Sequence, residues 1–332
     1  MAAVPAGAAG GYPPGDRKLG MEVLHFPDDP RPPWLVHPVL ALGNFDGLHR
    51  GHLKIVERVK RGAVEHGGIA MAMTFDPHPP QVVRPDKAPP LLMTKDQRLD
   101  ALGRAGLPCV AVVRFTRELS QWDPETFVRT VLVEWLRVSE VWVGANFLFG
   151  RERSGNFTAL RTLGQRYGFR AEKIDPIRYK EFVVSSTRIR RLVAEGRMDE
   201  AAALLGHPYS LAGTIVEGRR RGREIGFPTA NLQTANELIP PNGVYATTLT
   251  IDGIVHAALT NIGLNPTFGD STAATIETYV LRYDGDLYGR EVQLGFVQRF
   301  RDERRFDDLD GLKAQIEADR RRAERLFTRL SV

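Results

Sequence analysis

Apolar runs alternate with helical patterns over the first two thirds of the chain. Between about residues 21 and 205, short apolar runs predict strands, and segments with one apolar face lie between them. Because strands that alternate with helices form parallel sheets covered on both faces, we expect an α/β fold with a doubly wound parallel sheet. Such sheets bind ligands beyond the carboxyl ends of their strands. The expected strands are Val39–Leu42, Ile69–Phe75, Cys109–Phe115, Val141–Val143 and Ala171–Ile174.

Capping signals mark where several of these helices begin. Thr94 and Gln97 have the spacing of a capping box, and Asp123 is a cap followed by Pro124 at the first helical position. A further helix is expected directly after His52. Its apolar face would consist of Leu53, Val56, Val59 and Ala63.

After Gly206 the pattern changes to strand-like runs joined by turns. Asp252-Gly253 and Asp284-Gly285 are short-turn signals, so we expect an antiparallel, barrel-like β domain followed by a terminal helix. The expected strands are Leu211–Val216, Tyr245–Ile251, Ile254–Asn261, Thr275–Tyr283 and Val292–Arg299. The apolar face of the terminal helix would consist of Leu312, Ile316, Ala323, Phe327 and Leu330.

The chain therefore divides into a tail and two expected domains. Its 332 residues exceed the size at which one core normally keeps growing. Residues 1–20, rich in Ala, Gly and Pro, predict a disordered tail. The first domain would span residues 21–205 and the second residues 206–332.

Composition narrows the class of protein and its surroundings. No run of about 18 apolar residues could span a membrane, and the first 20 residues do not resemble a secretory signal. The single cysteine, Cys109, allows no internal disulfide, so we expect a cytoplasmic protein. The net charge of +5 suits either nucleic acid or phosphorylated small molecules. The basic clusters are not interleaved with aromatic residues, which favours small molecules.

The segment Gly43–His52, GNFDGLHRGH, carries the strongest chemical signal. It lies between a predicted strand and a predicted helix, so backbone N–H groups and the helix dipole form an anion site. His49 and His52 are three residues apart and face the same way, and Gly51 leaves room for a ligand near the backbone. The string resembles the H-x-G-H signature of the nucleotidylyltransferase superfamily, in which the histidines contact ATP phosphates.

Two further elements end predicted strands of the first domain. In Thr74–Pro79, TFDPHP, the prolines stop the strand and fix a loop at the same sheet edge. In Gly144–Gly150, GANFLFG, the amide of Asn146 stands beside two phenylalanines, a combination that suits a flat, polar-edged ring. Taken alone, the first is also compatible with a simple proline turn and the second with core packing.

A third element, Ser185–Arg190 or SSTRIR, opens a helix after an apolar run. Ser185 or Ser186 would cap this helix. The hydroxyls, the free N–H groups and Arg188 would form a second phosphate cradle, although a plain capped helix needs only one of these residues.

The order of these four motifs resembles that of the bifunctional prokaryotic riboflavin kinase/FAD synthetases. Later segments resemble the kinase module of that family, and the resemblance covers about residues 21–330. These segments are LLGHPY (Leu204–Tyr209), GRRRGREIGFPTAN (Gly218–Asn231), NGVYA (Asn242–Ala246), NIGLNPTFG (Asn261–Gly269) and DLYG (Asp286–Gly289). The resemblance implies two ATP-dependent reactions, the phosphorylation of riboflavin to FMN in the second domain and the adenylylation of FMN to FAD in the first.

The resemblance also implies site residues in the first domain. His49 and His52 would be catalytic there. The residues expected at ATP are Gly43, Phe45, Gly51, Ser186, Thr187 and Arg188. Those expected at the flavin are Asp76, His78 and Asn146.

In the second domain a loop rich in glycine and arginine, Gly218–Gly226, suits phosphate binding. Gly218 and Gly222 are the expected ATP contacts, and no single arginine is assigned a role. The hydroxyl of Thr229 and the amide oxygen of Asn231 are hard ligands suited to Mg²⁺, and by resemblance they match the magnesium and ATP ligands of the family. The alternative for this pair is a turn with two polar residues.

Glu277 gives an independent indication of a site. Strand alternation places it on one side with Tyr279, Leu281 and Tyr283, and a carboxylate among such residues is costly unless it is paired or used. Burial would raise its pKa toward that of a useful base, and the structural alternative is a buried salt bridge. In the family, a glutamate at this place is the kinase general base. Some members carry histidine where this chain has Tyr279.

Two other functions remain open from the sequence. The H-x-G-H chemistry could serve another phosphorylated metabolite, but the PTAN element and Glu277 argue against this. A nucleic-acid-binding or regulatory protein would fit the basic charge but not the complete set of catalytic motifs. The expected partners are therefore riboflavin, FMN and ATP, without nucleic acid or membrane, in a monomer or weak homo-oligomer.

Overall fold

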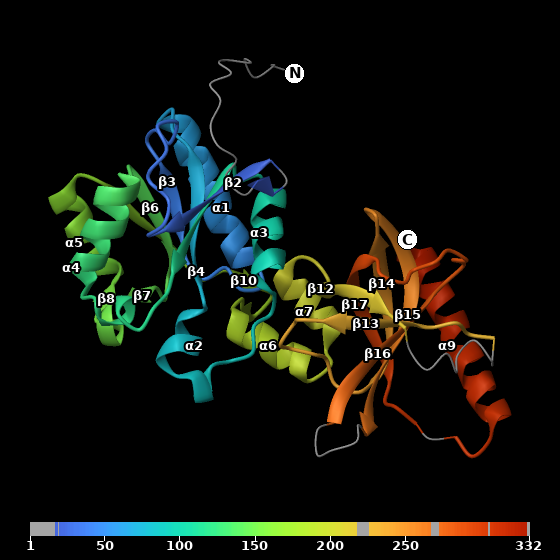
Figure 1. Cartoon of the computed structure of the whole chain (residues 1–332). Coiled ribbons are helices and arrows are strands. Elements are labelled where there is room, and N and C mark those ends of the chain that lie inside the picture. The colour runs from blue at the N-terminus through green and yellow to red at the C-terminus, as the bar shows by residue number, and fades with distance from the viewer. Residues whose placement is uncertain (1–16, 19, 218–225, 267–271, 305, 331–332) are drawn as a thin grey trace. The chain divides into compact units, whose positions relative to one another are not determined.

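The computed structural model describes residues 17–18, 20–217, 226–266, 272–304 and 306–330, and Figure 1 shows it. Two compact units make up the chain, which passes between them several times. The first unit comprises Met1–Asn44, Ile55–Pro85 and Leu99–Ile174, and the second comprises Phe45–Lys54, Asp86–Arg98 and Asp175–Val332. Of the expected disordered tail, Arg17–Lys18 form strand β1, and most of the rest lies outside the described residues. Within the described part of the chain, no helix is both long enough and apolar enough to cross a bilayer.

A seven-stranded sheet forms the centre of the first unit, in the order β1-β2-β5-β4-β3-β6-β9. All neighbours are parallel except β1, which runs antiparallel to β2, so the expected fold class is confirmed. Because β3 lies between β4 and β6, the strand order reverses beside it, and such a switch point is where α/β sheets bind ligands. The strands are β2 (Met21–Phe26), β3 (Val39–Leu42), β4 (Ala70–Asp76), β5 (Cys109–Arg114), β6 (Glu140–Gly144) and β9 (Arg170–Ile174).

Helices cover both faces of this sheet. Leu40 and Leu42 of β3 join a core that includes Val131 and Leu160 of the helices on one side. The alternate residue Val39 faces α1, because a Cβ added to Gly62 would lie 3.3 Å from its Cγ1. The helices are α1 (Arg50–Glu65), α2 (Pro79–Val83), α3 (Lys95–Arg104), α4 (Pro124–Phe127), a π-helix η3 (Val128–Leu136) and α5 (Phe157–Tyr167). Short elements complete the region: η1 (Pro85–Lys87), η2 (Leu119–Gln121), η4 (Arg151–Arg153), β7 (Leu148–Phe149) and β8 (Gly155–Asn156).

Local signals predicted the helix starts better than the helix faces. The capping box is present in full, since the Thr94 N–H donates to Gln97 Oε1 at 2.8 Å and the Gln97 N–H donates to Thr94 Oγ1 at 3.2 Å. Asp123 caps α4 by accepting from the Thr126 N–H. On α1, however, Leu53 is exposed and Ile55 is buried, so the expected face was wrong at its first position.

The second unit contains a closed antiparallel barrel in the order β12-β13-β16-β15-β14-β17, which confirms the expected barrel. Ile251 pairs with Ile254 across a two-residue turn in which Asp252 and Gly253 have φ of 48° and 82°. The Asp252-Gly253 signal therefore marks a short turn as expected, and positive φ at both positions is type I′ geometry. The strands are β12 (Tyr209–Val216), β13 (Ala230–Thr234), β14 (Gly243–Ile251), β15 (Ile254–Pro266), β16 (Thr272–Val280) and β17 (Glu291–Arg301).

Helices α6 (Ser186–Ala194) and α7 (Met198–Leu205) belong to the same unit and share one hydrophobic core with the barrel. The core residues of these helices are Ile189, Leu192, Val193, Met198, Ala201, Leu204 and Leu205, and those of the barrel include Tyr209, Leu211, Tyr245 and Phe296. A small hairpin, β10 (Arg178–Tyr179) and β11 (Phe182–Val183), precedes α6. The apolar run before SSTRIR is therefore part of this hairpin and not of the large sheet.

The terminal helix α9 (Leu309–Leu330) buries Ala323 and Phe327 as expected. Leu330 is half exposed, so the expected face was wrong at its last position. Strand β16 ends at Val280, and the chain then turns. Tyr279 and Leu281 share a cluster with α9, whereas Tyr283 packs against the core inside the barrel. The expected common face of Glu277 therefore does not extend to Tyr283.

Candidate functional site

The H-x-G-H loop leaves β3 of the first unit and runs into α1 through three left-handed residues. Phe45, Gly47 and Leu48 have φ of 52°, 87° and 34°. A Cβ on Gly47 would lie 2.7 Å from Leu92 Cδ1, so only glycine fits both the conformation and the space there. The loop is thereby folded back tightly ahead of the helix, with Phe45 and Leu48 buried.

His49 and His52 are brought together at the start of α1. Their rings are stacked, with centroids 3.6 Å apart and planes 12° apart, which confirms that the two side chains face the same way. His49 Nδ1 accepts from the His52 backbone N–H at 3.3 Å, so in the neutral ring the proton lies on Nε2. A Cβ on Gly51 would lie 3.1 Å from His49 Cε1, so glycine leaves space for this ring.

Both imidazoles are neutral at pH 7. Burial, with a smaller contribution from the neighbouring Arg190, lowers the pKa of His49 to about 4. Burial also lowers the pKa of His52 well below its usual value, with a contribution from His49. Within the described part of the chain, the buried His52 Nδ1 has no hydrogen-bond partner. The pair can therefore offer N–H donors to an anion without carrying a fixed charge.

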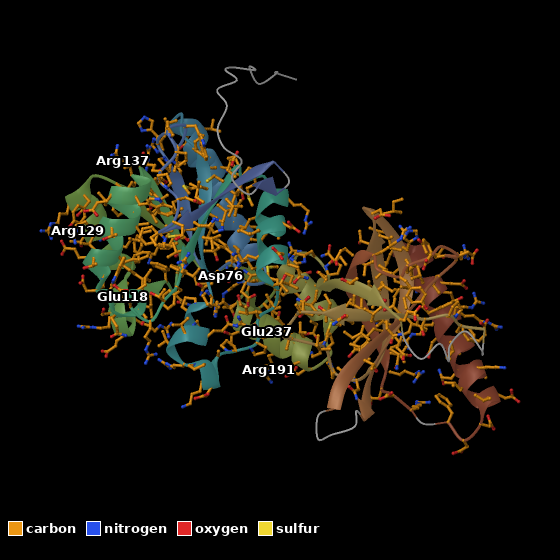
Figure 2. All side chains as sticks on the ribbon, viewed as in Figure 1. Asp76, Glu118, Arg129, Arg137, Arg191 and Glu237 are labelled. Atoms are coloured by element: carbon orange, nitrogen blue, oxygen red, sulfur yellow. The ribbon has the colours of Figure 1, made fainter. Side chains whose placement is uncertain are left out.

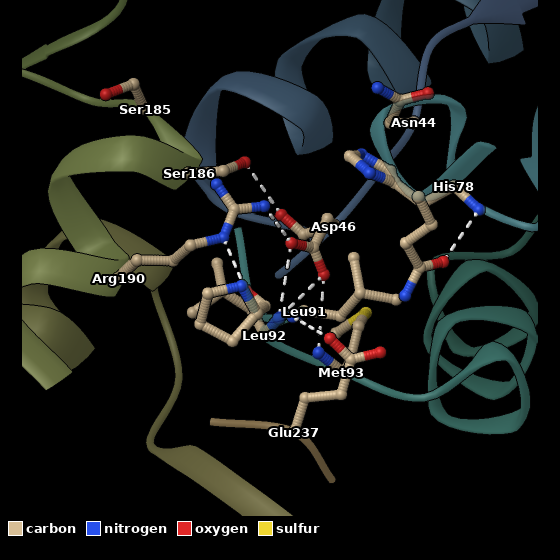
Figure 3. Close-up of polar contacts among 12 residues, drawn as sticks. Asn44, Asp46, His78, Leu91, Leu92, Met93, Ser185, Ser186, Arg190 and Glu237 are labelled. Carbon is tan, nitrogen blue, oxygen red and sulfur yellow. Dashed lines mark hydrogen bonds and ion pairs between the residues drawn. The ribbon is translucent and has the colours of Figure 1, made fainter. Parts of the chain in front are cut away.

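Asp46 connects the H-x-G-H loop to two neighbouring segments (Figure 3). The sequence analysis did not select this residue. Its carboxylate is 2% exposed, forms an ion pair with Arg190, and accepts from the Leu92 N–H at 3.0 Å and the Met93 N–H at 3.3 Å. Burial raises the pKa of Asp46, and Arg190 and the Leu92 N–H oppose this rise. One feature of the sequence could have identified Asp46. It lies between the apolar residues Phe45 and Leu48, and a carboxylate buried among apolar residues needs a partner.

The start of α6 lies against the same loop. Ser185 caps the helix by accepting from the Arg188 N–H at 3.3 Å, which decides between the two serines expected as cap. Ser186 Oγ donates to the Asp46 carbonyl at 2.9 Å. The exposed Thr187 adds a hydroxyl. Hence the two segments chosen from the sequence as phosphate cradles are joined directly.

The two arginines of this motif have different surroundings. Arg188 stacks on Phe182, with Cζ 3.9 Å from the ring centroid, and its buried Nε has no hydrogen-bond partner in the described part of the chain. Arg190, which sequence reasoning did not choose, pairs with Asp46 and donates through Nε to the Pro90 carbonyl at 2.8 Å.

The residues expected at the flavin lie in the first unit, at the carboxyl edge of its sheet. Asp76 ends β4, and Asn146, which is exposed, follows β6 by two residues (Figure 2 labels Asp76). Gly43 follows β3, the strand between them. His78 is buried and starts α2, with its N–H donating to Gln81 Oε1 at 3.2 Å. Of the phenylalanines near Asn146, Phe149 is part of the hydrophobic core, as the core-packing alternative had it.

Two residues expected in the kinase site, Asn231 and Glu277, lie on neighbouring barrel strands. Asn231 of β13 and Asn261 of β15 are both in register with Glu277 of β16, so the three side chains form one row on the same face. Thr229 directly precedes β13 and is half-buried, as are Asn231 and Glu277. Asn261 extends the expected pair, and only strand register could have identified it. Gly218 and Gly222 lie outside the described residues.

A histidine-containing loop that follows β3 of a doubly wound sheet, together with a barrel that carries an amide-carboxylate-amide row, defines a two-part nucleotide-dependent transferase. The chain matches the family model for FAD synthetase over residues 35–188 and the family model for riboflavin kinase over residues 205–327. Both matches fall in the order that the motifs predicted. This chain belongs to the family of bifunctional riboflavin kinase/FMN adenylyltransferases.

Similar proteins support this membership over most of the chain. It is 36% identical to the bifunctional riboflavin kinase/FMN adenylyltransferase of Listeria monocytogenes, over 89% of this chain and 94% of that one. It is 37% identical to the protein of that name from Pseudomonas fluorescens, over 85% and 90%, and 36% identical to that of Escherichia coli K12, over 87% and 92%. The fold resembles the crystal structure of a macrolide-efflux protein from Streptococcus pneumoniae, with a TM-score of 0.81, 26% identity, and 91% and 98% of the two chains covered.

Proposed function

We propose that residues 206–332 phosphorylate riboflavin to FMN and that residues 21–205 adenylylate FMN to FAD, each with ATP. The observation that carries this proposal is that two different family models match adjacent, non-overlapping parts of one chain. The site geometry supports it, because each half contains its own set of polar groups suited to phosphate chemistry.

In the adenylylation, a phosphate oxygen of FMN attacks the α-phosphorus of ATP, and the bond from that phosphorus to the bridging oxygen breaks to release pyrophosphate. We assign His49 and His52 to donate N–H hydrogen bonds to the phosphates as charge moves onto the leaving group. The stacked rings support this role, as does His52 Nδ1, which has no hydrogen-bond partner among the described residues. The remaining ATP contacts would come from Gly43, Phe45, Gly51, Ser186, Thr187 and Arg188, and the flavin contacts from Asp76, His78 and Asn146.

In the phosphorylation, the 5′-hydroxyl oxygen of the ribityl chain attacks the γ-phosphorus of ATP, and ADP leaves. We assign Glu277 to accept the hydroxyl proton, since its carboxylate lies in the row between Asn231 and Asn261. The alternative is that Glu277 forms a buried salt bridge, and mutation of Glu277 distinguishes the two roles.

The donor set beside Glu277 fits magnesium. The hydroxyl of Thr229 and the amide oxygen of Asn231 are neutral oxygen ligands, which suit an ion that arrives with nucleotide phosphates and keeps several waters. When bound, Mg²⁺ would neutralise phosphate charge during transfer. Thr229 and Asn231 would hold it, and Gly218 and Gly222 would contact the ATP phosphates.

We also propose a cytoplasmic enzyme that works as a monomer or weak homo-oligomer, with small molecules as its substrates. The single cysteine, Cys109, is buried, which suits a reducing compartment.

Chromatography of the products from riboflavin, ATP and Mg²⁺ tests the proposed function. The proposal predicts that FMN forms first and FAD follows from it. Adenylylation of a different phosphorylated metabolite, with FMN left unchanged, would instead support the alternative nucleotidylyltransferase.

A further inference from the structure

The short segment Leu91–Thr94 joins the H-x-G-H loop to the barrel within the second unit. Its four successive backbone N–H groups all donate to side chains. The Leu91 N–H donates to Glu237 Oε2 at 2.8 Å, and Glu237 lies in the segment that follows β13 of the barrel. The next two N–H groups donate to Asp46 of the loop (Figure 3). The strip Leu91–Thr94 is therefore hydrogen-bonded to the barrel half through Glu237 and to the H-x-G-H loop through Asp46.

A buried amide pair fixes the far end of this strip. Gln97 Oε1 accepts from the Thr94 N–H at 2.8 Å and from Asn236 Nδ2 at 2.7 Å. Asn236 is 7% exposed and its Oδ1 accepts from the Ala212 N–H of β12 at 2.9 Å. Gln97 Nε2 also donates to the Ser210 carbonyl at 3.3 Å. Since both amides are buried and multiply bonded, they specify one position for the strip.

The side chain of Leu92 couples the position of the strip Leu91–Thr94 to the position of the H-x-G-H loop. Leu92 is 2% exposed and belongs to the core that the barrel shares with α6 and α7. Its Cδ1 would lie 2.7 Å from a Cβ on Gly47, so the side chain fills the space beside the left-handed turn that leads to His49. A shift of the strip would therefore move Asp46 and Gly47 together.

We propose that Asn236 and Glu237, although carried by the kinase half of the chain, are positioning residues for adenylyl transfer. They act through the strip Leu91–Thr94 on Asp46, and through Asp46 on His49 and His52. This inference rests on the proposed role of the two histidines. The dependence runs in one direction only. The adenylylation site depends on Asn236 and Glu237 of the kinase half, whereas these two residues are not among the groups proposed for phosphorylation.

Variants of the full-length protein test the inference through both reactions of one preparation. In Glu237→Ala the Leu91 N–H loses its acceptor, whereas Glu237→Gln keeps an acceptor oxygen at the same place. Glu237 is exposed, so neither change threatens folding. A matched control is Glu291→Ala, which removes another exposed glutamate of the barrel whose carboxylate accepts from Thr214 Oγ1.

Asn236→Ala and Gln97→Ala, alone and combined, test the buried pair. A displacement of about 1 Å costs roughly 10²-fold in rate, so we expect Asn236→Ala to lower the kcat for FMN adenylylation roughly 10- to 100-fold, with KM for ATP changed less. Glu237→Ala should show a smaller loss that Glu237→Gln restores. The loss of rate in the double variant should be smaller than the product of the two single losses, because the two substitutions share the hydrogen bond between Asn236 and Gln97. Riboflavin phosphorylation should stay within about twofold in all of them.

Each outcome bears on the inference. It is overturned if Asn236→Ala and Glu237→Ala both adenylylate FMN at the normal rate, or if phosphorylation falls in parallel, which would indicate a general loss of folded protein. Should Asn236→Ala fail to fold, the comparison of Glu237→Ala with Glu237→Gln decides alone. Failure of the proposed function has a different signature, since His49→Ala/His52→Ala would then still produce FAD.

Discussion

The imidazole rings of His49 and His52 are stacked 3.6 Å apart at the start of α1, and the His49 Nδ1 accepts a backbone hydrogen bond from His52. A proton on either ring would bring charge into a buried site beside the other ring and near Arg190. The H-x-G-H loop is therefore built for neutral histidines, and this has consequences for stability as well as for the proposed adenylyl transfer.

Stability should fall in mild acid because of His49. Its pKa is about 4 in the folded protein and about 6.5 when unfolded, so between these values the unfolded chain binds more protons. The stabilisation is present above pH 6.5 and is lost as the pH falls toward 4, by on the order of 3 kcal/mol. Urea unfolding at several pH values, for the normal protein and His49→Asn, measures it. Equal pH slopes for the two proteins would refute this prediction.

Removing the charge of Asp46 should weaken both the fold and adenylyl transfer. Asp46→Asn leaves the Arg190 guanidinium, whose side chain is 13% exposed, without its anion. Loss of one partner of a buried pair typically costs about 3–5 kcal/mol. We expect a lower midpoint in urea and slower FMN adenylylation, with riboflavin phosphorylation by the folded fraction unchanged. A variant as stable and as active in adenylylation as the normal protein would show that the pair does not hold the loop.

A kinase fragment should be more stable with α6 and α7 than without them. A fragment of residues 207–332 should convert riboflavin to FMN and form no FAD, but it exposes the barrel core that these helices cover. Each large apolar side chain taken out of such a core removes about 1.5–3 kcal/mol. We therefore expect residues 175–332 to melt at a higher temperature than residues 207–332, with kinase activity in both. The opposite order of melting temperatures would contradict the shared core, and a folded 207–332 fragment without kinase activity would contradict the domain assignment.

Glu277→Gln should distinguish a catalytic role of Glu277 from a structural one in the kinase half. Glutamine keeps the volume of the side chain but cannot accept the hydroxyl proton, so phosphorylation should fall roughly 10²- to 10⁴-fold. Riboflavin binding and the conversion of supplied FMN to FAD should persist. The salt-bridge alternative predicts a lower melting temperature with little change in rate per folded molecule. A stable variant with full kinase activity would exclude Glu277 as the base.

The sequence predicted those parts of the fold that short-range patterns determine. Val39–Leu42 was found at its observed bounds, because four successive apolar residues ahead of a glycine are typical of a strand buried on both faces. The strands Met21–Phe26 and Ala230–Thr234 were missed. The first is interrupted by Glu22 and His25, and the second is mostly polar, so their place in a sheet depends on neighbours far along the chain.

The same limit applies to the site. The two histidines could be identified because they lie in one short motif, and their spacing predicted that the side chains face the same way, whereas the stacking of the rings is seen only in the structure. Asp46 and Arg190 are 144 residues apart, and no local pattern reports their ion pair. Sequence reasoning favoured Arg188 in the same motif, and only the orientation of α6 distinguishes the two arginines.

One chain with two successive reactions at separate sites should lose them one at a time, which the products formed from riboflavin, ATP and Mg²⁺ by His49→Ala/His52→Ala would reveal. Loss of one electrostatic donor typically costs about 10²–10³ in rate, so the loss of two should stop the second reaction. The normal protein should form FAD, whereas the double variant should accumulate FMN at a near-normal rate. If the folded double variant formed FAD as fast as the normal protein, the H-x-G-H histidines would not be the adenylylation site.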